Sequence, residues 1–259
     1  MTASLKSHSH GQTMVLTVSN PEHRNALGPE IYAAGVEALN VAESSPEVRS
    51  VVITGEGSHF CAGGNLQRLL ANRQLPPEVQ AQSIEGLHNW IETIRAFPKP
   101  VIAAVEGACA GAGFSLALAC DLIVAAQDSV FVMAYSNVGL SPDGGATWSL
   151  VRALPRATAM QLLLSGERTD AARLHSLGVI TRVSEPGHAL DDALALGERM
   201  NARAPNALAS IKELANDATG ATLHAQLAAE RDHFVRNLHH ANAGEGIAAF
   251  LDKRPARYR

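Results

Sequence analysis

Residues 99–121 read KPVIAAVEGACAGAGFSLALACD, and they combine the parts of one structural unit. Residues 101–105 are an apolar and largely β-branched run, which is typical of a buried strand. Residues 107–113 are all small, with three glycines among seven, and predict a turn. Residues 114–120 then predict a helix, whose first N–H groups lack partners within the helix and favour a negative charge. The segment therefore predicts an anion site between a strand and a helix.

Several known motifs share this outline. A dinucleotide fingerprint requires Gly or Ala where the chain has Leu116, and a phosphate-binding P-loop requires a Gly-Lys pair, which the chain lacks. Residues 113–117 fall one residue short of the G-x-S-x-G nucleophile elbow, so a serine hydrolase built on Ser115 stays an alternative. A plain turn that lets a helix pack closely on a sheet is the simplest alternative.

The same construction occurs a second time, earlier in the chain. Residues 48–54 predict a strand, and the small residues of SHFCAGGNL, residues 58–66, follow it before the next predicted helix. One turn centres on Gly64 and the other on Ala112. Two backbone N–H groups that converge on one oxygen would form an oxyanion hole.

Composition limits the classes of protein. The chain has 259 residues, is 46% hydrophobic and carries a formal charge of −4, which fits one large domain or a domain with an appendage. The absence of a Lys/Arg run argues against nucleic acid as a partner. No signal peptide or membrane span is expected, so we expect a soluble, cytoplasmic protein. Three cysteines without C-x-x-C spacing predict neither a disulfide scaffold nor a thiolate metal site.

The remaining pattern is mixed at first and helical at the end. Further strands are expected at 14–18 and 130–133, and a mobile loop or lid is expected over residues 66–83, which Pro76 and Pro77 interrupt. Helices are expected from residue 28 and over 84–97, through 148–154, and at 157–164, 170–177, 189–203, 207–217 and 223–238. The change predicts a boundary near Leu190, with a core of residues 1–190 and a helical region of residues 191–259.

Four blocks carry a resemblance to a known family. They are FCAGGNL at 60–66 and the stretches 100–121, 139–147 and 245–258, and they resemble the enoyl-CoA hydratase/isomerase family, or crotonase superfamily. The similarity runs from about residue 13 to the C-terminus. It implies an α/β fold, a right-handed spiral of ββα units followed by a helical trimerisation region, assembled as a homotrimer or a hexamer of two trimers. It also implies an acyl-CoA substrate, with no separate cofactor and no metal.

The resemblance assigns roles to individual residues. The two oxyanion-hole donors would be the backbone N–H groups of Gly64 and Ala112. Family hydratases carry glutamates at the positions of Ser115 and Tyr135, so efficient hydration is not expected, because water addition needs an acid and a base. Asp143 lies in an S-P-D-G-G turn like that of family isomerases, including those of phenylacetyl-CoA degradation, and one carboxylate suffices to move a proton.

Other positions are implied to bind the substrate. Ala62 would hold the adenine through its carbonyl, Arg24 the CoA phosphates, and Lys253 the nucleotide of a neighbouring subunit. Tyr135 and His88 are also expected to bind the substrate. His88 and Asp143 together match family aroyl-CoA dehalogenases as well, which have a tryptophan where this chain has Tyr135. The alternatives are therefore a hydratase without its usual glutamates, a dehalogenase-like hydrolase, a serine hydrolase and a non-catalytic acyl-CoA binder.

Overall fold

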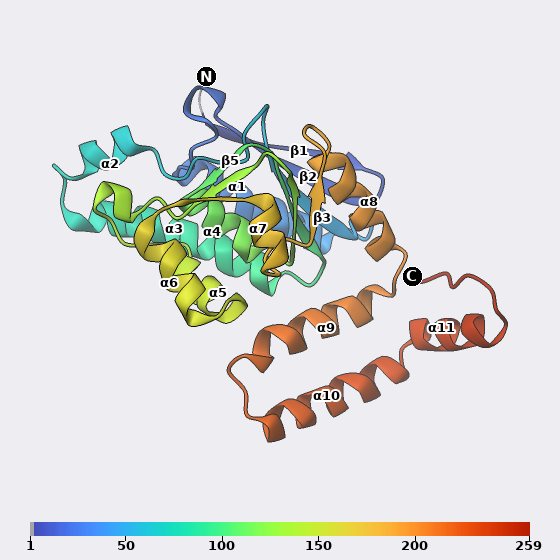
Figure 1. Ribbon diagram of the computed structural model, residues 1–259. Coiled ribbons are helices and arrows are strands. Elements are labelled where there is room, and N and C mark those ends of the chain that lie inside the picture. The colour runs from blue at the N-terminus through green and yellow to red at the C-terminus, as the bar shows by residue number, and fades with distance from the viewer. Residues whose placement is uncertain (1–2) are drawn as a thin grey trace.

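The structure is a computed structural model that describes residues 3–259 (Figure 1). The strands are β1 Ser4–His10, β2 Thr13–Ser19, β3 Ser50–Gly55, β4 Val101–Val105, β5 Ala108–Ala110, β6 Leu122–Ala126, β7 Val130–Val132, β8 Arg168–Asp170 and β9 Arg182–Ser184. The α-helices are α1 Pro29–Ser44, α2 Leu66–Asn72, α3 Pro77–Ala96, α4 Ala112–Ala119, α5 Ala146–Ala153, α6 Arg156–Ser165, α7 Ala171–Ser176, α8 Ala189–Asn201, α9 Pro205–Ala218, α10 Leu223–Leu238 and α11 Ala241–Leu251. Short 3-10 turns, η1 Pro21–His23 and η2 Ser136–Val138, complete the chain.

Two sheets form the body. The larger has six strands in the order β1-β2-β3-β4-β6-β9, parallel throughout except for the antiparallel pair of β1 and β2. The smaller has the order β5-β7-β8. Consecutive ββα units give one strand to each sheet, β4 and β6 to the larger and β5 and β7 to the smaller. This arrangement confirms the predicted α/β spiral of ββα units.

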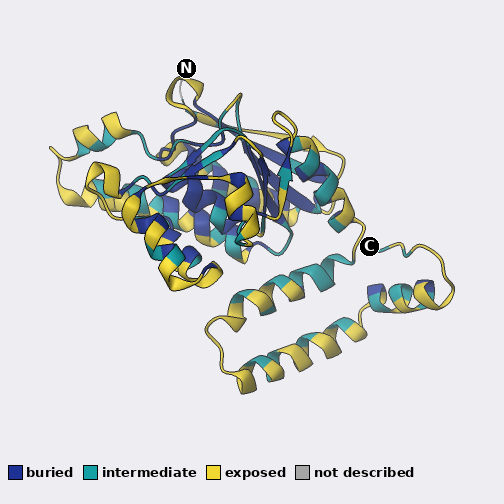
Figure 2. Cartoon of the chain, viewed as in Figure 1, coloured by how far each residue is buried: buried dark blue, intermediate teal, exposed yellow. Residues whose placement is uncertain are grey.

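The central strands bury both of their faces. Successive side chains of β4, such as Ile102 and Ala103, belong to different apolar clusters, as expected for a strand whose successive side chains point to opposite faces. The larger cluster includes residues of α1, α3 and α4, and the smaller includes Ala193 and Leu194 of α8. Figure 2 shows buried residues gathered in the sheets and in the helices beside them. Burial on both faces explains why these strands read as continuous apolar runs.

The last three helices stand away from this body (Figure 1). Their side chains are mostly exposed or half-buried (Figure 2). Helix α8, in contrast, contacts β3, β4 and β6. The division of the chain near Leu190 stays a prediction, but the first helix beyond it packs with the sheet, and the projecting helices begin at Pro205.

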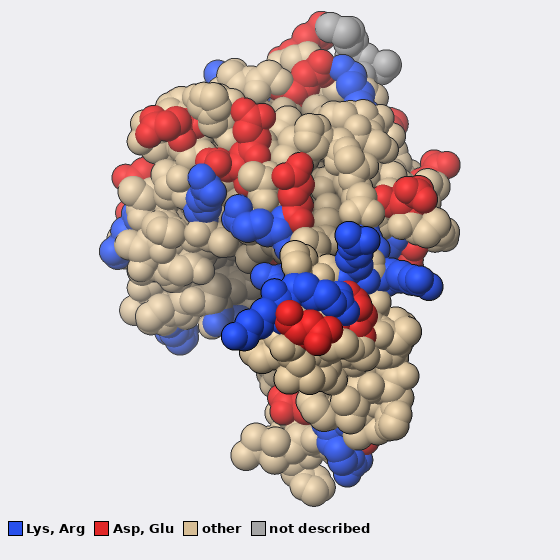
Figure 3. Space-filling model, turned by 90° about the vertical axis from the view of Figure 1, so that its right-hand side faces the viewer, with Lys and Arg blue, Asp and Glu red and all other residues tan. Residues whose placement is uncertain are grey.

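The C-terminal tail returns from α11 to the body. Arg49 donates from Nη2 to the carbonyl of Tyr258 at 3.0 Å and from Nη1 to that of Asn201 at 3.1 Å. Glu245 accepts from both Arg254 nitrogens, at 2.7 and 3.0 Å, and this pairing lowers the pKa of Glu245 to about 2. Figure 3 shows basic and acidic side chains gathered where the body meets the projecting helices. The tail is therefore held at both ends.

The expectation of a loop over residues 66–83 is wrong. Helix α2 fills the first part, and Asn65 caps it by accepting a hydrogen bond from the N–H of Arg68 at 3.1 Å. Helix α3 begins at Pro77, seven residues before the predicted start, because a proline fits the first position of a helix without loss of a hydrogen bond. Across residues 3–259, no helix combines the length and apolar character needed to cross a lipid bilayer.

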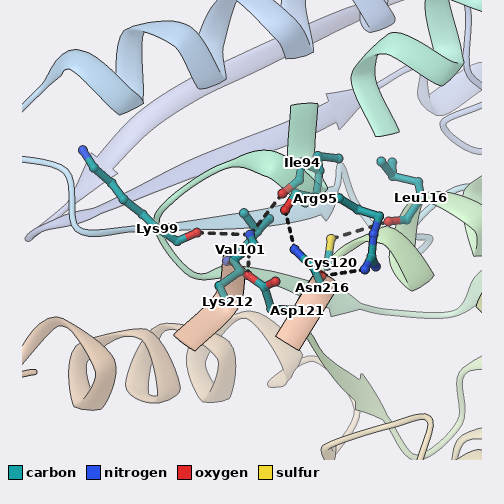
Figure 4. A network of polar contacts seen from close by, with 9 residues as sticks. All are labelled: Ile94, Arg95, Lys99, Val101, Leu116, Cys120, Asp121, Lys212 and Asn216. Atoms are coloured by element: carbon teal, nitrogen blue, oxygen red, sulfur yellow. Dashed lines mark hydrogen bonds and ion pairs between the residues drawn. The ribbon is translucent and has the colours of Figure 1, made fainter. Parts of the chain in front are cut away.

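One partly exposed ion pair ties α9 to the body (Figure 4). Lys212 Nζ lies 2.8 Å from Asp121 Oδ2 and donates to the carbonyls of Ile94 and Lys99 at 3.0 and 3.4 Å. The same Asp121 oxygen accepts from the N–H of Val101, the first residue of β4. Burial raises the pKa of Asp121, and Lys212 opposes that rise. The pair therefore offsets the cost of burying this carboxylate.

Lys212→Met is expected to lower the free energy of unfolding by about 1 kcal/mol at neutral pH, since it removes the cation of a partly exposed ion pair and a donor to two backbone carbonyls. The deficit should shrink as the pH falls toward about 4, because the raised pKa of Asp121 lets the folded protein take up this proton at a higher pH than the unfolded chain does, and a protonated Asp121 needs no cation. Urea unfolding at several pH values measures both effects. Lys6→Met is the matched control: it breaks the exposed pair with Glu56 and should change stability little. A deficit independent of pH would contradict this account.

Candidate active site

One cavity of about 410 Å³ collects most of the predicted site residues. Gly64, Ala112 and Asp143 all line it, as do Ala62, His88 and Tyr135. Its wall also has apolar side chains from α2, α3 and the η2 region: Leu66, Leu69, Ile84, Leu87, Val138 and Leu140. The shape is that of a ligand pocket, mostly apolar with a few polar groups that face inward.

The loop that carries Gly64 is held from two sides. The N–H of Leu27 donates to the carbonyl of Gly63 at 2.8 Å, and the N–H of Ala62 donates to that of Arg24 at 2.9 Å. On the other side, Cys61 pairs with β5 through two backbone hydrogen bonds, to Ala108 and from Ala110, at 3.0 and 2.9 Å. The backbone around Gly64 is therefore fixed before any ligand arrives.

Two glycines let the Gly64 loop touch the start of α4. A Cβ on Gly113 would lie 2.4 Å from the carbonyl oxygen of Cys61. A Cβ on Gly63, whose φ is +97°, would lie 2.8 Å from the carbonyl oxygen of Ala110 and 3.4 Å from the nitrogen of Ala112. The approach that brings Gly64 and Ala112 to one cavity thus depends on missing side chains. Ala112 is the first residue of α4, so its N–H has no partner within the helix.

Asp143 is held by two hydroxyl groups. Tyr135 donates to Asp143 Oδ1 at 2.6 Å, and Ser115 donates to the Asp143 backbone carbonyl at 2.9 Å. Burial and the neighbouring Asp143 raise the pKa of Tyr135 well above its ordinary value, so its hydroxyl remains a donor. Gly144, at φ +60°, packs closely on Ser115: a Cβ added to Gly144 would lie 2.9 Å from the Cβ of Ser115. The turn therefore closes directly over α4.

The wider chain matches a known family of sequences. The family described as enoyl-CoA hydratase/isomerase matches residues 9–259. The chain belongs to this family. Members of this family act on acyl-CoA esters, and three of the four resembling blocks, residues 60–66, 100–121 and 139–147, line the cavity described above.

Individual members of the enoyl-CoA hydratase/isomerase family are similar over nearly the whole chain. The 1,2-epoxyphenylacetyl-CoA isomerase of Escherichia coli K12 is 37% identical over 253 residues, with 97% of each chain covered. The 2,3-dehydroadipyl-CoA hydratase of the same organism is 32% identical, with 94% of this chain and 93% of the relative covered. The crystal structure of an enoyl-CoA hydratase from Polaromonas sp. JS666 is similar with a TM-score of 0.98, and its sequence is 71% identical. The match covers 99% of this chain and 100% of that one.

These names include hydratases and an isomerase, so the reaction has to be argued from the site. Among the described residues that line the cavity, Asp143 is the one acidic side chain. Ser115 and Tyr135 occupy the positions where the resemblance places the glutamates of family hydratases. The Ser115 hydroxyl contacts the carbonyls of Gly111 and Asp143 and the hydroxyl of Tyr135. No histidine contacts it among residues 3–259, so the serine hydrolase alternative lacks its base.

Two predicted substrate contacts lie outside the cavity. Arg24 and Lys253 are exposed, and neither lines the cavity, so their roles toward CoA stay predictions. His88 lines the cavity from α3, with its Nδ1 3.9 Å from Glu85 Oε2. No group of three or more His, Cys, Asp or Glu side chains in the described part of the chain is placed to hold a metal ion.

Sequence reasoning missed several polar residues of the cavity, among them Tyr32 of α1 and Arg68 of α2. Burial raises the pKa of Tyr32 to about 12, with Arg68 opposing and Asp143 adding to the rise. The signal that could have found Arg68 was the N-cap Asn65, which places a helix, and hence Arg68, next to the FCAGGNL block.

Proposed function

We propose that this protein is an enoyl-CoA isomerase that moves a double bond along an acyl chain with Asp143 as its single proton carrier. The observation that carries this proposal is that, among residues 3–259, Asp143 is the one acidic side chain on the wall of a cavity that Gly64 and Ala112 also line. A relative that is 37% identical is an isomerase of an epoxide-bearing CoA ester, which supports isomerisation as the type of reaction.

The reaction needs two proton transfers and no water. The Asp143 carboxylate removes a proton from the carbon next to the thioester carbonyl of a 3-enoyl-CoA. The electron pair moves onto the carbonyl oxygen, where the N–H groups of Gly64 and Ala112 would hold the enolate. The protonated Asp143 then returns the same proton to the far end of the conjugated system, which gives the 2-enoyl-CoA. One carboxylate therefore serves as base and then as acid.

Hydration is less favoured by this site. Water addition to a 2-enoyl-CoA needs one group to activate the water and another to protonate the adjacent carbon. The Ser115 hydroxyl donates hydrogen bonds to the backbone carbonyls of Gly111 and Asp143. The Tyr135 hydroxyl donates to the Asp143 carboxylate and has a raised pKa, so neither residue offers a second base.

A substrate comparison tests the proposal. The wild-type enzyme is offered a 3-enoyl-CoA, a 2-enoyl-CoA and an aryl-CoA, and products are followed by mass spectrometry. We expect the double-bond shift to be faster than hydration by at least about 100-fold, the scale of one general acid–base group. Faster hydration, or release of halide from a halogenated aryl-CoA, would replace the isomerase with the hydratase or the dehalogenase-like hydrolase. Binding without turnover of any substrate would indicate a non-catalytic member.

Tyr135→Phe is expected to lower kcat about tenfold with KM nearly unchanged, because it removes a charge-assisted hydrogen bond that orients the Asp143 carboxylate. Steady-state kinetics on the 3-enoyl-CoA measure the change. Tyr258→Phe, at the C-terminal tail and outside the cavity, is the matched control. A rise in KM without loss of kcat would mean that Tyr135 binds substrate and does not orient Asp143.

We also propose that the projecting helices join three copies of the chain. They expose large apolar side chains, among them Leu223, Leu227, Phe234, Phe250 and Leu251, a density that is unusual for a monomer surface. In such a trimer Lys253 could reach the nucleotide of a neighbouring subunit's substrate, and Arg24 the phosphates of its own.

Phe250→Asp is expected to shift the particle mass from that of a trimer toward that of a monomer, because it puts a charge where an 84% exposed phenylalanine would be covered. Light scattering coupled to size-exclusion chromatography measures the mass. Val41→Asp, on α1 of the body, is the control for an equivalent change on another exposed apolar residue. A monomeric wild type would contradict the proposal directly.

A further inference from the structure

Arg68 brings a guanidinium group to the wall of the cavity. It projects from α2, and its Nε atom is buried with no hydrogen-bond partner. The guanidinium donates from Nη2 to the Ser83 hydroxyl at 3.3 Å, and it also lies beside the Tyr32 hydroxyl, where its charge and hydrogen bonding lower the pKa of Tyr32. Within the described residues, no carboxylate forms an ion pair with it. A buried donor that is left unpaired is costly, so a chain that retains one points to a partner supplied by a ligand.

The surroundings of Arg68 are polar and face the same space. Ser83 and Gln80 of α3 line the cavity beside it, and the Gln80 side-chain oxygen is fixed by Asn72 at 2.7 Å. Tyr32 senses both Arg68 and Asp143 electrostatically, which places the two charged groups around one buried hydroxyl. The cavity therefore presents the Arg68 cation together with Gly64, Ala112 and Asp143.

The proposal rests on the acyl-CoA function given above and specifies its substrate. We infer that Arg68 recognises a carboxylate carried by the acyl group, so that the preferred substrates are CoA esters of dicarboxylic acids. A carboxylate accepts hydrogen bonds from the edge of a guanidinium that includes Nε, and Nε is the buried donor that lacks a partner here. The Ser83 hydroxyl, already within reach of Arg68, provides a further donor.

Binding of unreactive ligands tests this inference independently of catalysis. Two saturated acyl-CoA esters of equal chain length, one ending in a carboxylate and the other in a methyl group, are titrated calorimetrically into the wild-type protein. The carboxylate ester is expected to bind at least about tenfold more tightly. Arg68→Met should abolish this preference, and Arg68→Lys should retain part of it, since lysine keeps the charge but loses the paired geometry. Arg73→Met, at the exposed end of α2, should leave the preference intact.

Each other outcome overturns the inference. Equal binding of the two esters would mean that Arg68 does not select a carboxylate. Tighter binding of the ester that ends in a methyl group, or of an aryl-CoA, would mean the same. An equal loss of affinity for both esters in Arg68→Met would assign Arg68 to the part of CoA that they share. Because the titration needs no turnover, a preserved carboxylate preference without isomerisation would reject the proposed reaction and keep the assignment of Arg68.

Discussion

Asp143→Asn is expected to lower kcat for the double-bond shift by a factor on the order of 10³, within the range found for general acid–base groups. The asparagine side chain has nearly the same shape, and its oxygen can still accept the hydrogen bond that Tyr135 donates to Oδ1. It cannot take up and return a proton. The substitution thus removes the chemical role and leaves the packing in place, so KM should change little.

The measurement should separate the two proton transfers. In deuterated water, exchange of the proton next to the thioester reports the first transfer even where no product accumulates. Glu85→Gln provides the matched control, because it is the same acid-to-amide change on an exposed side chain of α3 beside the cavity. Retention of wild-type isomerisation in Asp143→Asn would exclude Asp143 as the proton carrier, and loss of substrate binding would point to a structural role.

Gly63→Ala is expected to lower kcat/KM by about 10² to 10³-fold, the effect of losing one oxyanion-hole donor. The added Cβ would lie 2.8 Å from the carbonyl oxygen of Ala110, a backbone atom that cannot move aside without shifting β5 and the start of α4. The loop of Gly64 and the N-terminus of α4 would separate. The N–H groups of Gly64 and Ala112 would then no longer reach one oxygen.

A second glycine isolates this effect from backbone strain. Gly57 also has a positive φ, +73°, but a Cβ added there would meet no atom within 4 Å. Gly57→Ala should therefore cost about 1 kcal/mol of stability and leave kcat/KM intact. Thermal unfolding and kinetics on both variants make the comparison. Equal kinetic losses in the two variants, or none in Gly63→Ala, would show that the approach of the two loops is not required for catalysis.

The sequence predicted the centre of the fold better than its edges. The continuous apolar run of β4 and the small residues before α4 have one physical interpretation, burial beside a close turn. Strand β1 was missed because its sequence, SLKSHSH, is polar and lies mostly exposed at the antiparallel edge. Helix α2 was missed because none of its residues is buried, so its pattern shows no core face.

The site shows the same limit. Small residues at Gly64 and Ala112 and a turn acid at Asp143 are local features, and they do line one cavity as predicted. Their roles in catalysis stay predictions. Tyr32 reaches the cavity only because α1 is placed beside it, which is a property of tertiary structure that no local pattern encodes, whereas for Arg68 the N-cap Asn65 was a local signal that went unread.

The contact between Gly144 and Ser115 has a consequence for redesign. A glutamate grafted at position 115 would have to occupy the space that the turn now fills, and Gly144 could not retreat without carrying its neighbour Asp143 away from the cavity. Conversion of this scaffold into an efficient water-adding enzyme would thus demand concerted remodelling of helix and turn, so that stepwise single-codon routes between the two chemistries should pass through inactive intermediates.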